Sequence, residues 1–116
     1  EPEIFQHKKP LYEEKKHFEV VRRFAELTSN AGVKLMIYIP PVNQKVNNEL
    51  YAPDYYDSLI EAIARQLEGY DVPILDLTKA VPDELFVDGG HVKEDGDRII
   101  AEKLCEFIKK NYDIYR

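Results

Sequence analysis

The chain has 116 residues, of which 44% are hydrophobic and 33% are charged, as is typical of a globular rather than a disordered protein. Its formal net charge is −6, from 22 acidic and 16 basic residues, which argues against a nucleic-acid-binding surface because such surfaces are rich in basic residues. No stretch approaches the ~20 apolar residues of a membrane-spanning helix. The length predicts one domain over residues 1–116.

The N-terminal third predicts an extended segment followed by a helix. Residues 1–10 contain two prolines and no hydrophobic periodicity, which predicts an extended lead-in. Residues 11–28 predict an amphipathic helix, and Gly32 is expected to end it as a left-handed cap. The apolar positions at helical spacing, expected to face inward, are Phe18, Val21, Phe24, Ala25 and Thr28.

The middle of the chain predicts two strands and a second helix. Residues 33–39 form a mostly apolar run, which predicts a strand covered on both faces. Two prolines end this strand, and a loop is expected over residues 44–51. A helix then begins at Pro53-Asp54 and ends at Gly69. Residues 72–77 predict the second strand.

A short helical turn is expected within residues 78–85, and a last helix over residues 94–111. Ile100, Leu104, Phe107 and Ile108 are expected on the inward face of that helix. Cys105 is the only cysteine, so an intrachain disulfide is excluded and a small buried thiol is expected.

Helices and strands alternate along the chain, which predicts an α/β fold with a parallel sheet and helices on its faces. Two strands leave sheet edges and helix faces uncovered. We therefore expect the chain to be part of a larger unit. An N-terminal segment outside this chain, a second chain or another copy of it, as in a homo-oligomer, would complete the sheet.

Residues 86–104 carry the pattern that indicates chemistry. Asp88 precedes His91 by three positions, with Gly89 and Gly90 between them, so the chain can fold back and the carboxylate can accept the ring N–H. That bond fixes one tautomer and leaves the other ring nitrogen free to act as a base. Asp-Gly and Gly-Gly are also ordinary turn dipeptides, so a turn with a solvated histidine is the alternative.

The pattern is Phe-x-Asp-Gly-x-His, then Gly, then Ile-Ala-x-x-Leu, at Phe86, Asp88, Gly89, His91, Gly96, Ile100, Ala101 and Leu104. It resembles the C-terminal block of the SGNH (GDSL-type) hydrolase superfamily. The superfamily's Gly-Asp-Ser nucleophile block and two oxyanion-hole blocks have no counterpart in this chain. The resemblance thus implies the C-terminal half of a flavodoxin-like SGNH domain with three α/β/α layers.

The resemblance also implies a function. The chain would supply Asp88 and His91, the aspartate and histidine of a Ser-His-Asp triad, to a serine esterase or O-acyltransferase that needs no cofactor or metal. The run from Ile39 to Asn43, the tyrosine-rich helix after it and a strand ending in Asp76 are similar to the envelope D-alanyl-transfer and O-acetyltransferase-like branch. This branch implies acyl esters of cell-envelope carbohydrate as substrates and an extracytoplasmic or membrane-anchored location, with the cytoplasm as the alternative.

Asn43 follows the first strand at its carboxyl end, where open α/β sheets bind ligands. The resemblance makes it a candidate substrate-binding residue, and a turn-capping role has equal weight. Ser29 and Ser58, the only serines, fall at a helix end and inside a helix, whereas a nucleophile needs a strand-to-helix turn.

Two other hypotheses remain open. The first is a non-catalytic SGNH-like interaction or structural domain, motivated by the missing nucleophile. The second is a flavodoxin-like or response-regulator-like domain, which fits the alternation of elements but lacks a glycine-rich phosphate loop and an acidic cluster for Mg²⁺. His17 has no cysteine and no second histidine at helical spacing, so a metal site there is not expected.

Overall fold

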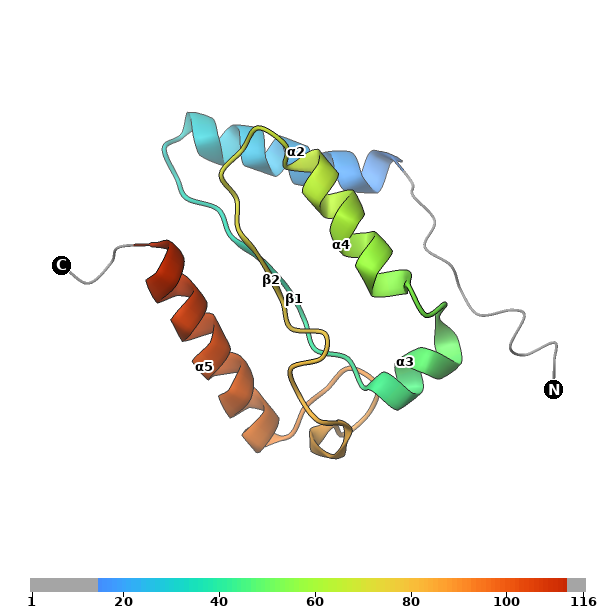
Figure 1. The fold of residues 1–116 in the computed structure, drawn as a ribbon. Coiled ribbons are helices and arrows are strands. Elements are labelled where there is room, and N and C mark those ends of the chain that lie inside the picture. Colours follow the sequence, from blue (N-terminus) through green and yellow to red (C-terminus); the bar gives the residue numbers. More distant parts are fainter. Residues whose placement is uncertain (1–14, 113–116) are drawn as a thin grey trace. The chain divides into compact units, whose positions relative to one another are not determined.

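The computed structural model describes residues 15–112 (Figure 1). Residues 1–10, and the first four positions of the helix predicted over residues 11–28, lie outside the described part of the chain. Within residues 15–112, the elements are α2 (Lys15–Asn30), β1 (Ile37–Ile39), α3 (Gln44–Leu50), α4 (Tyr55–Gln66), β2 (Ile74–Asp76), the 3-10 helix η1 (Asp83–Leu85) and α5 (Glu94–Asn111).

The fold is mixed α/β, as the sequence predicts. β1 and β2 form a two-stranded parallel sheet, in which the Ile37 N–H donates to the Pro73 carbonyl oxygen and the Leu77 N–H to the Ile39 carbonyl oxygen, both at 3.0 Å. Both strands are shorter than expected. Within the described residues each strand pairs only with the other, and residues 33–36 belong to no strand.

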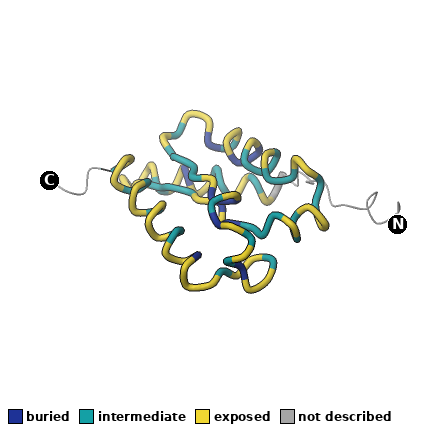
Figure 2. Tube along the Cα trace, turned by 60° about the horizontal axis from the view of Figure 1, so that its bottom comes forward, coloured by how far each residue is buried: buried dark blue, intermediate teal, exposed yellow. Residues whose placement is uncertain are grey.

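The chain packs into two compact units. The first comprises residues 15–37 and 48–74, and the second residues 38–47 and 75–112. Figure 2 shows that few positions along the chain are buried and that much of each helix is exposed. Among residues 15–112, no helix combines the length and the apolar character needed to cross a membrane.

The first unit is built on the packing of α2 against α4. Its buried residues are Ala25, Ala62, Ile63 and Leu67. At the C-terminal end of α4, the Arg22 guanidinium donates to the Gln66 carbonyl oxygen at 3.0 Å. A cation there satisfies a free carbonyl and interacts favourably with the helix dipole.

Two details of α2 test the sequence analysis. Gly32 has φ +70°, and the Val33 N–H donates to the Thr28 carbonyl oxygen at 2.9 Å, so the left-handed cap is confirmed. The expectation that Phe24 faces inward is wrong, because the residue is 57% exposed. Ala25, which was also expected to face inward, is buried, and adjacent helical residues point about 100° apart.

The prediction of a loop over residues 44–51 is wrong, because residues 44–50 form α3. The Asn43 side-chain oxygen accepts the Val46 N–H at 3.2 Å, which makes Asn43 the N-cap. The Asp83 carboxylate accepts the N–H groups of Gln44 and Lys45 at 2.7 and 3.2 Å. A seven-residue helix is marginal by itself, so these caps explain why it forms.

The second unit has its core around the ends of the two strands. Ile39, Leu77, Val81 and Phe86 are buried there. α5 has the predicted bounds, and the short helical turn expected within residues 78–85 is η1. The expectation that Cys105 is buried is wrong, because the residue is exposed. Its neighbour Leu104 is half-buried, and Cys105 points about 100° away from it along the helix.

Candidate functional site

The candidate site is the loop between η1 and α5, which belongs to the second unit. Phe86 and Val92 form an antiparallel bridge at its base. Just inside this bridge, the Val87 N–H donates to the His91 carbonyl oxygen at 2.7 Å. Phe86 is buried and anchors the base in the core, so the loop projects from a fixed point.

Within the loop, the backbone turns around the Asp88 carboxylate. Its Oδ1 accepts the N–H groups of Gly90 at 2.9 Å and His91 at 2.8 Å. This is the Asx-type turn that an aspartate before two small residues favours. The two N–H groups, together with the His91 side chain, hold the pKa of Asp88 below its ordinary value because they stabilise the charged form.

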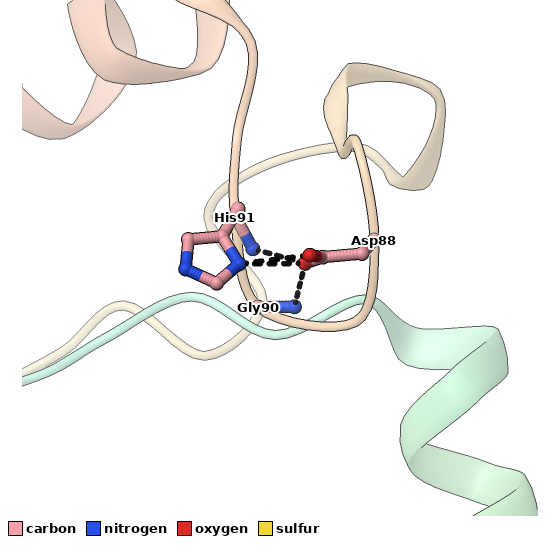
Figure 3. Close-up of polar contacts among 3 residues, drawn as sticks. All are labelled: Asp88, Gly90 and His91. Carbon is pink, nitrogen blue, oxygen red and sulfur yellow. Dashed lines mark hydrogen bonds and ion pairs between the residues drawn. The ribbon is translucent and has the colours of Figure 1, made fainter.

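The hydrogen bond expected between Asp88 and His91 is present (Figure 3). His91 Nδ1 lies 2.9 Å from both carboxylate oxygens. Because a carboxylate accepts hydrogen bonds, Nδ1 carries a proton, and in the neutral form of the ring Nε2 then has the lone pair. The side chains of His91 and Asp88 are 84% and 57% exposed, so Nε2 is open to an incoming group.

Asn43 lies beside this loop. Its backbone N–H donates to the Gly89 carbonyl oxygen at 3.2 Å. Its side-chain oxygen caps α3, which favours the turn-capping role for that atom. Its Nδ2 donates to no group in the described part of the chain. The structure therefore brings all three sequence-predicted residues, Asp88, His91 and Asn43, into one region.

A polar network that was not predicted from the sequence joins α3 to this region. Asp83 binds the first two N–H groups of α3. The Gln44 side-chain amide donates to the Thr78 carbonyl oxygen at 2.8 Å and to the Val42 carbonyl oxygen at 3.2 Å. Asn43 directly before a possible helix was a sequence signal for the cap. Nothing local pointed to Asp83, which lies 39 positions from Gln44.

Neither serine has the setting of a nucleophile, as the sequence analysis predicts. Ser29 is exposed at the end of α2, and Ser58 lies inside α4 with its hydroxyl 3.4 Å from an Asp54 carboxylate oxygen. Both belong to the first unit. The second unit contains no serine over residues 38–47 and 75–112, and its one threonine, Thr78, donates its hydroxyl to Asp76 at 2.7 Å.

Other parts of the second unit do not extend the site. A hollow of about 450 Å³ lies between β2, the residues after it and α5, and neither Asp88 nor His91 lines it. Among the described residues, no group of three or more histidine, cysteine or acidic side chains could hold a metal ion.

Comparison of the chain with protein-family models, with curated proteins and with solved structures finds no match. The proposal for the function therefore rests on the geometry of residues 86–92.

Proposed function

We propose that this chain is the C-terminal part of an SGNH-type serine esterase or O-acyltransferase, contributing the aspartate and histidine of a Ser-His-Asp triad. The observation that carries the proposal is the bond between Asp88 and His91 Nδ1, at 2.9 Å, with Nε2 left open. An oriented imidazole with one free nitrogen is what an acyl-transfer base requires.

In the proposed mechanism, a serine from a segment outside this chain attacks the ester carbonyl. His91 Nε2 takes the serine proton and returns it to the leaving alcohol, so that an acyl-enzyme forms. Water or an acceptor hydroxyl then attacks the acyl-enzyme with the same base. Asp88 orients the ring and stabilises the imidazolium, and its lowered pKa keeps it charged throughout.

The proposal includes the rest of the fold. The two-stranded sheet and the exposed Val20, Phe24 and Leu27 of α2 are surfaces that a complete three-layer α/β/α domain covers. An N-terminal segment or a second chain would supply the missing strands. By the resemblance, the substrates are acyl esters of cell-envelope carbohydrate and the location is extracytoplasmic or membrane-anchored. Asn43, whose N–H donates to the Gly89 carbonyl oxygen of the loop, would bind the substrate through its side-chain amide.

A non-catalytic SGNH-like interaction domain is the second candidate. It is favoured by the absence of serine from residues 38–47 and 75–112, the unit that holds the Asp-His pair.

The test is ester hydrolysis by the product of the complete reading frame, with an acetylated saccharide and an aryl acetate as substrates. His91→Ala is expected to lower kcat by at least ~1,000-fold, with an unchanged circular dichroism spectrum. His17→Ala, which removes an exposed histidine of α2, is the matched control and is expected to retain full activity. Activity that survives His91→Ala, or no hydrolysis by the wild type, would favour the interaction domain.

A further inference from the structure

The tip of the Asp88–His91 loop rests on the first turn of α3. The Asn43 N–H donates to the Gly89 carbonyl oxygen at 3.2 Å. A Cβ added to Gly89 would lie 3.1 Å from Val46 Cγ1, whereas one added to Gly90 would meet nothing within 4 Å. The loop is therefore packed against α3 at Gly89 and has open space at Gly90.

The first turn of α3 depends on one carboxylate. α3 has seven residues, which is too short to be stable by itself. Asp83 Oδ1 accepts the Gln44 N–H at 2.7 Å, and Oδ2 accepts the Lys45 N–H at 3.2 Å. Hydrogen bonds to a charged acceptor are stronger than neutral ones, and an anion at a helix N-terminus is favourable.

Asp83 is also joined to the base of the loop. It begins η1, and its carbonyl oxygen accepts the Phe86 N–H at 3.0 Å. Phe86 forms the bridge at the loop base with Val92. Asp83 therefore contacts the loop at two places: directly at its base, and through α3 and Asn43 at its tip.

We propose that Asp83 is a positioning residue, which fixes the Asp88–His91 loop by clamping the first turn of α3 beneath the loop tip. This inference rests on the proposed function for its consequence in catalysis. When the clamp is lost, Asp88 and His91 keep their own short-range bond, but the pair as a whole no longer holds one place relative to the strand ends. Turnover then falls because the base is misplaced.

The variants are Asp83→Ala, which removes both acceptor oxygens, and Asp83→Asn, which keeps one. Glu84→Ala is the matched control, because Glu84 is the next residue of η1 and its carboxylate accepts no hydrogen bond in the described part of the chain. A second matched pair is Gly89→Ala, which forces Val46 to move, and Gly90→Ala, which has open space.

Two readouts separate positioning from stability. The first is amide hydrogen exchange at Asn43, whose N–H bonds the loop tip. Exchange is expected to be roughly tenfold faster or more in Asp83→Ala, less affected in Asp83→Asn, and unchanged in Glu84→Ala. The second is hydrolysis by the complete gene product well below its unfolding temperature. There kcat is expected to fall roughly tenfold or more in Asp83→Ala, and to fall further in Gly89→Ala than in Gly90→Ala.

Unchanged Asn43 exchange in Asp83→Ala would overturn the inference, and so would a fall in kcat that matches only a lost folded fraction. Equal losses in Gly89→Ala and Gly90→Ala would also count against it. If His91→Ala leaves activity intact, the proposed function fails instead, and the exchange measurement still decides whether Asp83 holds the loop.

Discussion

Gly96 offers a direct test of the packing that joins α5 to the candidate loop. It lies in the first turn of α5 and is buried. A Cβ added there would lie 2.8 Å from Val92 Cβ and 3.3 Å from Val81 Cγ1. Alanine in a helix interior is ordinarily about 1 kcal/mol more favourable than glycine. Gly96→Ala therefore sets a helix-propensity gain against a steric clash.

The clash is expected to win. Overpacking a well-packed core costs about 1–3 kcal/mol, and the upper end applies because Val92 Cβ is bonded to the backbone and cannot rotate away. A cost of about 3 kcal/mol less a gain of about 1 kcal/mol leaves a net loss of about 2 kcal/mol. For a chain of this size, that loss lowers the melting temperature by roughly 8 °C.

Urea unfolding followed by far-ultraviolet circular dichroism measures this difference. Ala101→Gly, on the exposed face of α5, supplies the propensity term alone and is expected to lose about 1 kcal/mol. If Gly96→Ala is as stable as the wild type or more so, the close contact between Gly96 and Val92 does not exist, and the position of α5 against the loop base is wrong.

Two further predictions concern the second unit. The pKa of Asp88 is lowered in the folded state, so the stability contributed by its charge is fully present above its ordinary value of 3.8 and is lost as the pH falls through the lower folded value. The difference in unfolding free energy between the wild type and Asp88→Asn should thus shrink below about pH 4, and a difference that stays constant with pH would contradict this. Asp76→Ala leaves the buried Thr78 hydroxyl without its acceptor, at a cost of about 1–3 kcal/mol by urea unfolding. Asp71→Ala, an exposed acid before β2, is the control, and equal losses in the two variants would refute the role of the bond.

Local signals in the sequence were sufficient wherever the structure depends on neighbouring residues. α5 has three acidic residues in its first turn, two lysines in its last turn and a clear apolar stripe, so its bounds were predicted. Gly32 was predicted as a left-handed cap because few other residues adopt that conformation without strain. The bond between Asp88 and His91 belongs to the same class, since it closes within a single turn.

Non-local contacts account for what was missed. α3 contains two asparagines in seven residues, which are poor helix formers, and it forms because Asp83 binds its N-terminus from 39 positions away. The strand lengths depend on pairing partners that a run of apolar residues does not reveal. For Phe24 and Cys105, the helices were predicted, but both residues were counted as buried beside neighbours that are less exposed, because how far a buried face extends depends on what it packs against.

The candidate site also depends on both local and non-local contacts. The bond between Asp88 and His91 Nδ1 closes inside residues 88–91 and favours one imidazole tautomer. A triad additionally requires a hydroxyl near Nε2, and that distance is set by the placement of the whole loop against the strand ends. In this chain that placement depends on α3, and α3 depends on Asp83. The residue that most needs testing beyond the Asp-His pair is therefore one that touches neither of them.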